Sequence, residues 1–469
     1  MSVEIQPEAT PSAAAPSEAA ATLARLRKYF ATGVTRDRGW RVGQLEALKR
    51  LLTEHEKDIV EAVKEDLGRN DFDAWFGDVA PPAGDVEFAL KHLRSWMKPE
   101  RRKVPLVQMP AKARIQYEPL GVVLVIGPWN YPVNLSLGPV VAALAAGNCV
   151  VLKPSEVAPR TSALMAELVP QYLDKDAVAV IEGDGVVTQE LLAEGFDLAF
   201  FTGGTEIGRK IMAGAANTLT PVILELGGKS PVFVTPDADL DVTARRIAWT
   251  KLLNSGQTCI APDYLLVHES VKDELVAKIR TSLADMTAED TGGRPIVNQR
   301  QFDRLRGYLA VTKGTVVSGG EVDESARSIT PAILVDPDLD EPAMTEEIFG
   351  PILPVTSYSD LDQAIAFVNS RPKPLGLYVF SGNAKVADSI VERIPAGGAV
   401  INHCAIHYLV PSLPFGGVGA SGMGAYHGEW GFQAFSHRKS VAVKPTRIDP
   451  KMVYPPYSEK TQKLLRRMF

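Results

Sequence analysis

The chain of 469 residues has only three cysteines, Cys149, Cys259 and Cys404, and no two of them form a C-x-x-C pair. So few thiols cannot build a disulfide framework, and the missing pair argues against structural zinc. This composition suits a reducing compartment. We therefore expect a cytoplasmic protein that binds no metal.

The sequence also lacks an excess of charge of either sign, since 50 basic and 56 acidic residues are spread along it. Without a strong field, the chain has no general attraction for nucleic acid or for an anionic membrane surface. Long apolar runs are missing as well, because 120–126 and 140–146 fall short of the roughly 20 residues that a spanning helix needs. We expect no nucleic acid partner and no membrane span.

The N-terminal segment has neither the basic start nor the apolar centre of a secretory signal. Its richness in Ala, Pro, Ser and Glu predicts a disordered tail over residues 1–21. From 22 to 103, charged residues with apolar residues at helical spacing predict long surface helices. We interpret these helices as packing rather than chemistry.

Two stretches in which apolar strands alternate with helices predict an α/β protein. The first runs from Val122 to Leu226, and the second follows Lys229. This alternation indicates parallel sheets covered on both faces, with ligands at the carboxyl ends of the strands. The segments 104–117 and 440–453 are read as extended pieces outside both stretches, which can pair with each other or with a second subunit.

Cys259 is the candidate nucleophile. It lies in a polar, glycine-containing loop, whereas Glu225 ends an apolar run earlier in the chain. A thiol attacks only as the thiolate, and it needs a nearby group that moves protons or activates water. Glu225 is therefore the candidate base. Cys149 lies in an apolar segment and is expected to be a buried, inert thiol.

Two strand-to-helix turns are candidate cofactor segments. Gly203–Gly208 opens a predicted helix, where backbone N–H groups can face a phosphate, although a tight turn that merely needs glycine is an equally good reading. Lys153–Glu156 follows the second strand, where a ribose lies in a dinucleotide-binding sheet, although a solvated turn capped by Ser155 is commoner. The literal G-x-G-x-x-G at 417–422 follows a proline-rich loop rather than a strand, so we reject it as the dinucleotide-binding motif of a Rossmann fold.

Other polar residues are candidates with weaker signals. Asn130 stands between aromatic residues and prolines, where its amide can donate to a developing oxyanion or simply form a turn. Glu347 and Phe349 can place a carboxylate and a ring in a cleft, although two adjacent acidic residues, here Glu346 and Glu347, usually lie on the solvated surface. His407 and the other histidines of this region do not have metal-ligand spacing.

Seven segments, taken in order, resemble the aldehyde dehydrogenase superfamily. The resemblance covers nearly the whole chain from about residue 22 onward. The segments are 128–132 (PWNYP), 153–156 (KPSE), 201–205 (FTGGT), 225–229 (ELGGK), 256–259 (GQTC), 347–351 (EIFGP) and 413–417 (LPFGG).

The resemblance implies an aldehyde dehydrogenase fold with a Rossmann-like cofactor domain, an α/β catalytic domain and a small extended oligomerisation element. The implied division is a cofactor domain at 22–227 interrupted by 104–117, a catalytic domain at 228–414, a return to the cofactor domain at 415–439, and an oligomerisation strand with a C-terminal tail at 440–469.

The resemblance also implies roles for the candidate residues. Cys259 adds to the aldehyde, the Asn130 amide and the Cys259 backbone N–H bind the oxyanion, and Glu225 activates the water that hydrolyses the thioester. The implied cofactor is NAD, with NADP accepted as well. Its implied contacts are Lys153 and Glu156 at the adenosine ribose, Gly203, Gly204, Thr205 and Gly208 near the pyrophosphate, and Glu347 and Phe349 at the nicotinamide end, with Leu226 as a further cofactor contact.

Within the superfamily the chain is most similar to class 3 enzymes, the group with fatty aldehyde and coniferyl aldehyde dehydrogenases. The similar segments are 261–264 (APDY), 421–428 (SGMGAYHG), 435–438 (FSHR) and 454–457 (YPPY). Class 3 membership implies a homodimer that oxidises a hydrophobic aldehyde to its acid. Trp129, Tyr131, Tyr408, Leu409 and Val410 flank the site segments and favour an apolar substrate, unless they belong to the core.

Three alternatives stay open at this point. A dehydrogenase that passes its thioester to coenzyme A is disfavoured by Glu225, because a positioned base favours water. A cofactor-independent thiol esterase would need only Cys259 and Glu225 and would leave the cofactor segments without a purpose. A non-catalytic binding protein on the same fold would not need Cys259, Glu225 and Asn130 together.

Overall fold

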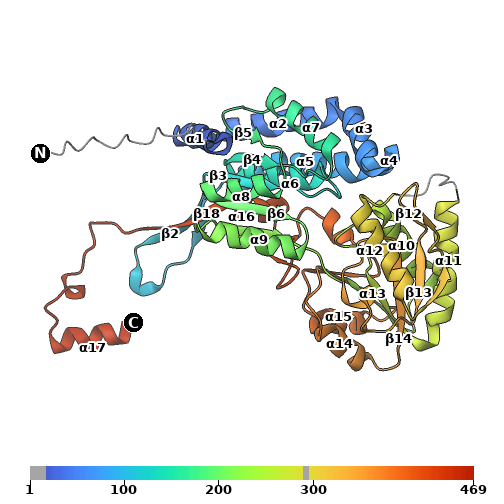
Figure 1. Ribbon diagram of the computed structural model, residues 1–469. Coiled ribbons are helices and arrows are strands. Elements are labelled where there is room, and N and C mark those ends of the chain that lie inside the picture. Colours follow the sequence, from blue (N-terminus) through green and yellow to red (C-terminus); the bar gives the residue numbers. More distant parts are fainter. Residues whose placement is uncertain (1–16, 289–294, 469) are drawn as a thin grey trace, which may run out of the picture.

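The computed structural model describes residues 17–288 and 295–468 (Figure 1). Most of the predicted tail, residues 1–16, lies outside these ranges. Ser17 caps the first helix, α1 (Glu18–Ala31), because its hydroxyl accepts a hydrogen bond of 3.1 Å from the Ala20 N–H. The prediction of a disordered tail as far as residue 21 is therefore wrong for residues 18–21.

Helices form the N-terminal part of the chain, as the charge pattern predicts. They are α2 (Arg38–Glu54), α3 (Glu56–Leu67), α4 (Asp71–Ala74), a π-helical turn at Trp75–Val79 and α5 (Ala80–Trp96). Their apolar stripes, which include Leu45, Leu48, Val63 and Leu93, are buried in the same core as the first large sheet.

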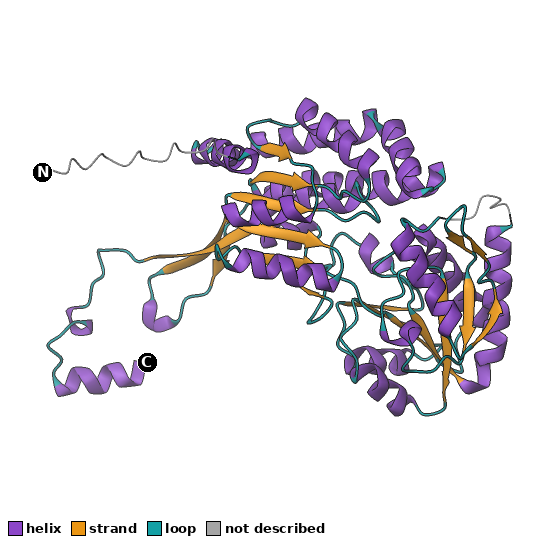
Figure 2. Ribbon diagram, viewed as in Figure 1, coloured by secondary structure: helices purple, strands orange, loops and turns teal. Residues whose placement is uncertain are grey.

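The first large sheet has six strands in the order β17-β7-β6-β3-β4-β5, and all pairs are parallel except β17 with β7. Its strands are β3 (Val122–Ile126), β4 (Cys149–Lys153), β5 (Val178–Val180), β6 (Leu198–Thr202), β7 (Val222–Glu225) and β17 (Gly422–Met423). Between them run α6 (Asn134–Ala146), α7 (Pro159–Tyr172), α8 (Gly185–Glu194) and α9 (Thr205–Ala216). Helices lie on both faces (Figure 2), which explains why β3, β4 and β6 are buried along their whole length and mainly apolar.

The second large sheet has seven strands in the order β10-β13-β14-β9-β8-β15-β16, with only β10 antiparallel to its neighbour. Its strands are β8 (Pro231–Val234), β9 (Tyr264–His268), β10 (Thr315–Ser318), β13 (Ala332–Val335), β14 (Ile352–Tyr358), β15 (Gly376–Phe380) and β16 (Gly398–Ile401). Its helices are α10 (Leu240–Leu252), α11 (Lys272–Thr287), α12 (Gln299–Val311), α13 (Pro342–Thr345), α14 (Leu361–Asn369) and α15 (Ala384–Arg393). A short hairpin joins β11 (Val322–Asp323) to β12 (Ser328–Ile329).

A third, three-stranded sheet contains the extended segments that the sequence sets apart. Its strands are β1 (Glu100–Arg102), β2 (Lys112–Pro119) and β18 (Ser436–Val443), and β2 pairs antiparallel with both others. Pairing of the two extended segments with each other is therefore confirmed. The sheet projects from the body together with the C-terminal segment, which ends in α17 (Glu459–Met468) (Figure 1).

The C-terminal part also returns to the first large sheet. After β17, helix α16 (Gly428–Ala434) packs against α5 and α6 before the chain enters β18. Within the described residues, no helix is both long and apolar enough to cross a membrane.

Candidate active site

Cys259 and Glu225 line one cavity, although one lies in a loop and the other in a strand of the six-stranded sheet. Glu225 is the last residue of β7, and Cys259 lies in the loop between α10 and β9. The cavity measures about 990 Å³ including its open mouth. Most of its remaining lining is aromatic or aliphatic: Phe76, Pro81, Tyr131, Leu135, Leu226, Trp249, Leu253, Ile260, Leu375, Ile406, Tyr408, Leu409, Phe415 and Tyr426.

The loop that carries Cys259 is strained. Asn254, Ser255 and Gly256 are consecutive residues with positive φ angles of 50°, 56° and 72°. A Cβ on Gly256 would lie 2.2 Å from the Gly350 carbonyl oxygen, so only glycine fits there. Backbone strain of this kind persists where the surrounding structure fixes it, and it is concentrated at functional sites.

The protein surroundings of Cys259 oppose ionisation of its thiol. Burial raises its pKa to about 12, and the neighbouring carboxyl groups of Glu347 and Glu225 act in the same direction. Backbone N–H groups of Cys259 and Ile260 favour the thiolate but do not outweigh the burial. Formation of the nucleophile therefore requires a proton acceptor or an added positive charge in the site.

Glu225 is a carboxyl group with few polar neighbours. It is 3% exposed, and neither of its oxygens has a hydrogen-bond partner among the described residues. Burial raises the pKa of Glu225 well above its usual value. A carboxyl group in these surroundings takes up protons readily, as a general base must.

Asn130 is buried next to the cysteine loop. Its side-chain amide donates a hydrogen bond of 3.1 Å to the Gln257 carbonyl, two residues before Cys259. An amide nitrogen has two N–H donors, and this bond uses one of them. Asn130 itself is not part of the cavity lining, whereas the next residue, Tyr131, is.

Lys153 and Glu156 lie at the carboxyl end of β4, where the sequence predicts a ribose. The Lys153 ammonium is buried and donates to the Pro154 carbonyl at 2.9 Å and to Glu156 at 3.1 Å. The Glu156 side chain is about half exposed. Ser155 does not cap α7, whose N-cap is Ala158, so the alternative reading of this turn is wrong in that respect.

The N-terminus of α9 is open. Gly204 is its N-cap and supplies no side chain, and a Cβ on Gly204 would meet nothing within 4 Å. Gly208 packs against Leu226, where a Cβ would lie 2.6 Å from a side-chain carbon. Gly203 donates to the Glu225 carbonyl at 3.0 Å, and the Thr205 hydroxyl donates to Ala420 at 3.3 Å. Helix N–H groups without a capping side chain fit a phosphate.

Glu347 and Phe349 lie in a loop that Lys229 fixes in place. Lys229 forms an ion pair with Asp263 and donates to the carbonyls of Ala343 and Glu346. The Glu347 carboxyl packs against the backbone at Gly227, and burial raises its pKa to about 8. Phe349 has a φ of 45°, and its ring meets that of Trp129 edge to face, with centroids 5.4 Å apart.

Together these groups fit a dinucleotide. They provide a cation at one strand end, an open helix N-terminus, a partly buried carboxyl group and an aromatic ring. The predicted cofactor residues thus lie at the carboxyl-terminal side of the six-stranded sheet and in the loop before β14.

Comparison with known proteins identifies the family. Residues 6–441 match the profile of the aldehyde dehydrogenase family. The chain belongs to that family. It is 47% identical to the dimeric NADP-preferring aldehyde dehydrogenase of Rattus norvegicus over 93% of this chain and 97% of that protein. It is 45% identical to aldehyde dehydrogenase family 3 member H1 of Arabidopsis thaliana, over 96% and 94%.

A solved structure supports the same assignment. The substrate-bound state of Staphylococcus aureus AldH matches this fold with a TM-score of 0.92 and 39% identity, over 96% of this chain and 99% of that chain. The predicted fold class and the class 3 resemblance are therefore confirmed. The chain is an NAD(P)-dependent aldehyde dehydrogenase, and the comparisons favour neither a coenzyme A-acylating enzyme nor a thiol esterase.

Parts of the dehydrogenase that the sequence did not single out also reach the cavity. Arg69, Asp73, Phe76, Gly77 and Pro81 line it, so the interpretation of residues 22–103 as packing alone is wrong for this stretch. Amphipathic periodicity gives no sign of such a role, because it marks every buried face alike. The π-helical turn at 75–79 is a signal of a functional segment that only the structure reveals.

The expected aromatic flank of the dehydrogenase site is only partly present. Tyr131, Tyr408 and Leu409 line the cavity, whereas Trp129 instead contacts Phe349 and Val410 is not in the lining.

Among the other cysteines, Cys404 lines the cavity, and Cys149 is fully buried in β4 with a pKa raised to about 12 by burial. Burial lowers the pKa of His407 to about 4, and neither ring nitrogen has a partner among the described residues.

Proposed function

We propose that this enzyme oxidises hydrophobic aldehydes, aromatic or medium- to long-chain aliphatic, to carboxylic acids through a thioester on Cys259. The observation that carries the proposal is the pairing of Cys259 and Glu225 in a cavity whose other walls are mainly aromatic and aliphatic. Such walls bind an apolar substrate body by removing its surface from water.

Cys259 starts the reaction by adding its sulfur to the carbonyl carbon. Because burial raises the pKa of the thiol, its proton must pass to a base as the C–S bond forms, and Glu225 lines the same cavity. The carbonyl oxygen becomes an oxyanion, which accepts hydrogen bonds from the Asn130 amide and the Cys259 backbone N–H. When bound, the dinucleotide provides the acceptor for the hydride.

Glu225 releases the thiol proton to solvent and then completes the reaction by taking a proton from water. The water oxygen bonds to the thioester carbon, the C–S bond breaks, and the acid leaves while Cys259 regains its proton. The raised pKa of Glu225 makes its carboxylate a stronger base than an exposed glutamate. A base in the cavity explains why water, rather than coenzyme A, removes the acyl group.

A matrix of aldehydes against both cofactors tests this function. We expect benzaldehyde, hexanal and longer alkanals to give reduced nicotinamide, followed by its absorbance, with higher kcat/KM than a semialdehyde that carries a carboxylate. Cys259→Ser is the control for chemistry at the site. Higher efficiency with the charged semialdehyde would contradict the proposed substrate class.

We further propose that the enzyme is a homodimer. The projecting sheet has β1 and β18 at its edges, and most residues of β18 are exposed in the single chain. Exposed strand edges are surfaces on which a second chain can pair. The relative from Rattus norvegicus is named as dimeric. Light scattering should give twice the chain mass, and a monomer or tetramer mass would contradict the proposal.

We also propose that the enzyme is cytoplasmic. All three cysteines are free thiols, which suits a reducing compartment. Fractionation of cells that express the tagged chain should place it with cytosolic markers. Recovery in the membrane or secreted fraction would contradict this location.

A further inference from the structure

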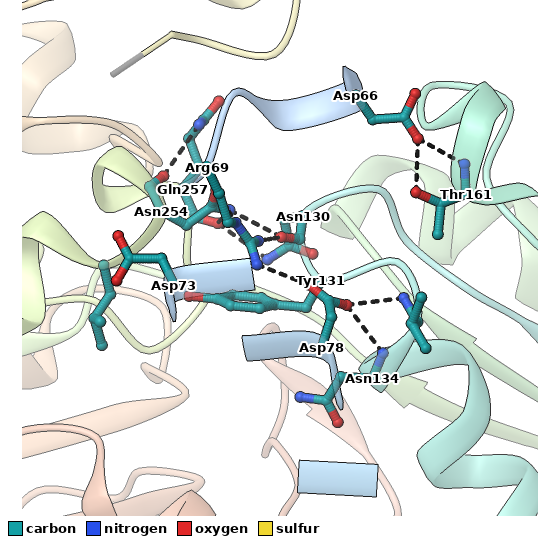
Figure 3. A network of polar contacts seen from close by, with 12 residues as sticks. Asp66, Arg69, Asp73, Asp78, Asn130, Tyr131, Asn134, Thr161, Asn254 and Gln257 are labelled. Atoms are coloured by element: carbon teal, nitrogen blue, oxygen red, sulfur yellow. Dashed lines mark hydrogen bonds and ion pairs between the residues drawn. The ribbon is translucent and has the colours of Figure 1, made fainter. Parts of the chain in front are cut away.

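Arg69 lies at the centre of a buried polar network beside the catalytic loops (Figure 3). It follows α3, in the short connection to α4, and only 4% of its side chain is exposed. The proposed reaction gives this arginine no task. All three nitrogens of its guanidinium group donate hydrogen bonds, each to a different residue.

Two of these bonds reach the loops that carry the reaction. One guanidinium nitrogen donates to the backbone carbonyl of Asn130, and Nε donates to the Asn254 side-chain oxygen at 2.9 Å. Asn254 in turn donates from its amide to the Asn130 carbonyl at 2.9 Å and to the Gln257 carbonyl at 3.2 Å. The Asn130 carbonyl thus receives two donors, while the Asn130 side chain donates to Gln257.

The third bond fixes Arg69 itself. The third guanidinium nitrogen pairs with Asp78 at 2.7 Å, and Asp78 is fully buried. The other Asp78 oxygen accepts from the backbone N–H groups of Val133 and Asn134, at the start of α6. The guanidinium plane also covers the Tyr131 ring, with Cζ 4.3 Å from the centroid.

These bonds decide between two roles for an arginine at a substrate cavity. A guanidinium group with a free fork binds the carboxylate of a charged substrate. Here each guanidinium nitrogen already donates to Asp78, Asn130 or Asn254, and the positive charge is paired with Asp78, so recognition of a substrate charge is disfavoured. The remaining role for Arg69 is to fix the distance between the loop of Asn130 and the loop of Cys259.

We propose that Arg69 is a positioning residue that fixes the Asn130 amide relative to the Cys259 backbone N–H, so that both donors meet the same oxyanion. This inference rests on the proposed function, in which those two groups bind the oxyanion. Arg69 touches neither substrate nor cofactor in this role. Its effect passes through the Asn130 carbonyl and through Asn254 to the Gln257 carbonyl.

Arg69→Lys is the most selective variant. A lysine keeps the positive charge for Asp78, but it lacks the planar fork that reaches Asn130 and Asn254 together. We expect kcat to fall by roughly 10- to 100-fold with KM for the aldehyde within about threefold, because a misplaced oxyanion donor weakens the transition state more than substrate binding. The loss should be similar for benzaldehyde and hexanal.

Arg41→Lys is the matched control. Arg41 is also buried and also donates to backbone carbonyls, those of Thr35 and Ala145, but it lies in α2 away from the cavity lining. The same substitution there should lower Tm and leave kcat within about twofold of the wild type. Equal effects on kcat at the two arginines would overturn the proposal.

A double-mutant cycle with Asn130→Ala separates positioning from general stability. If Arg69 acts through Asn130, Arg69→Lys should lower kcat by less than about threefold when Asn130 is already Ala. Effects that multiply in the double variant would overturn the proposal. A normal kcat in Asn130→Ala alone would show instead that the proposed oxyanion site is wrong, and the role of Arg69 would fall with it.

A second variant covers the case in which Arg69→Lys does not fold. Arg69→Gln combined with Asp78→Asn removes the ion pair as a unit and leaves no unpaired buried charge. We expect the same loss of kcat and the same loss of coupling to Asn130→Ala. Wild-type kcat in this double variant would overturn the proposal.

Discussion

Two parts of the active site differ in what they are made of. The proposed reaction groups are polar, and they sit at the end of a strand or in a loop: Cys259, Glu225 and Asn130. The aromatic lining comes from a π-helical turn, from α10, from the 3₁₀ helix at Ile406–Leu409 and from a C-terminal loop: Phe76, Trp249, Tyr408 and Phe415. Its rings pack on one another, as Phe76 does on Trp249 and Tyr408 on Phe415.

In the proposed mechanism, chemistry and substrate choice therefore have separate physical origins. The reaction groups depend on proton affinities, which burial shifts, whereas the lining depends on apolar contact area. Changes to the reaction groups should act on kcat, and changes to the lining should act on KM. The following predictions test that separation.

Cys259→Ser should have the largest effect. We expect aldehyde oxidation to fall by at least about 10³-fold, because a hydroxyl is a far poorer nucleophile than a thiol at neutral pH. Binding of the cofactor, measured by fluorescence titration, should stay close to normal. Cys149→Ser is the matched control, since Cys149 lies in β4 away from the cavity. Substantial turnover by Cys259→Ser would remove Cys259 from the reaction groups.

Glu225→Gln should lower kcat by roughly 100-fold, because the loss of a general base typically costs 10²–10⁴-fold. Deacylation should suffer more than hydride transfer. Stopped-flow absorbance should therefore show a first-turnover burst of reduced nicotinamide before a slow steady state. A variant without a burst, but with a full deuterium isotope effect on turnover, would place Glu225 before or during hydride transfer.

The pH profile sharpens the same prediction. Only the ionised form of Glu225 can accept a proton, and burial raises its pKa well above the usual value. Deacylation in the wild type should therefore rise with pH well above pH 4.5, as the carboxylate forms, instead of levelling off there. Single-turnover measurements on Glu225→Gln should lose this rise. An unchanged pH profile in Glu225→Gln would show that a group other than Glu225 titrates.

Phe76→Ala should raise KM for benzaldehyde by roughly five- to tenfold and leave kcat within about twofold, because it removes apolar contact without touching the reaction groups. Trp430→Ala is a suitable control, since that ring is 45% exposed and is not part of the lining. Steady-state kinetics over both aldehyde classes measure the effect. A large fall in kcat with unchanged KM would show that the lining and the reaction groups do not act separately on KM and kcat.

Glu156→Gln should have the smallest effect. Glu156 is about half exposed, so its repulsion of a 2′-phosphate is screened by solvent, and we expect a three- to tenfold rise in the NADP to NAD ratio of kcat/KM. Glu167→Gln, on the exposed surface of α7, controls for the loss of one negative charge. An unchanged ratio would place the adenosine ribose elsewhere.

The elements of the fold were largely predictable. The strands β3 to β7 lie within the predicted stretch 122–226, and β8 to β16 follow Lys229 as predicted, because such elements form local apolar patterns bounded by turn residues. The boundary at residue 21 was not predictable from composition, since a single capping serine starts α1 within a segment rich in Ala and Glu.

The amino-acid sequence alone indicates which residues can do chemistry: a thiol in a polar loop, a carboxyl group at the end of a strand and glycines at a helix start. These are local properties, encoded by neighbours in the chain. The packing of the folded chain brings Glu225 and Cys259 into one cavity, raises both of their pKa values by burial, and lets Arg69 reach the carbonyl of Asn130 across 61 positions. Contacts between distant segments depend on how whole helices and sheets pack, and no local pattern specifies them.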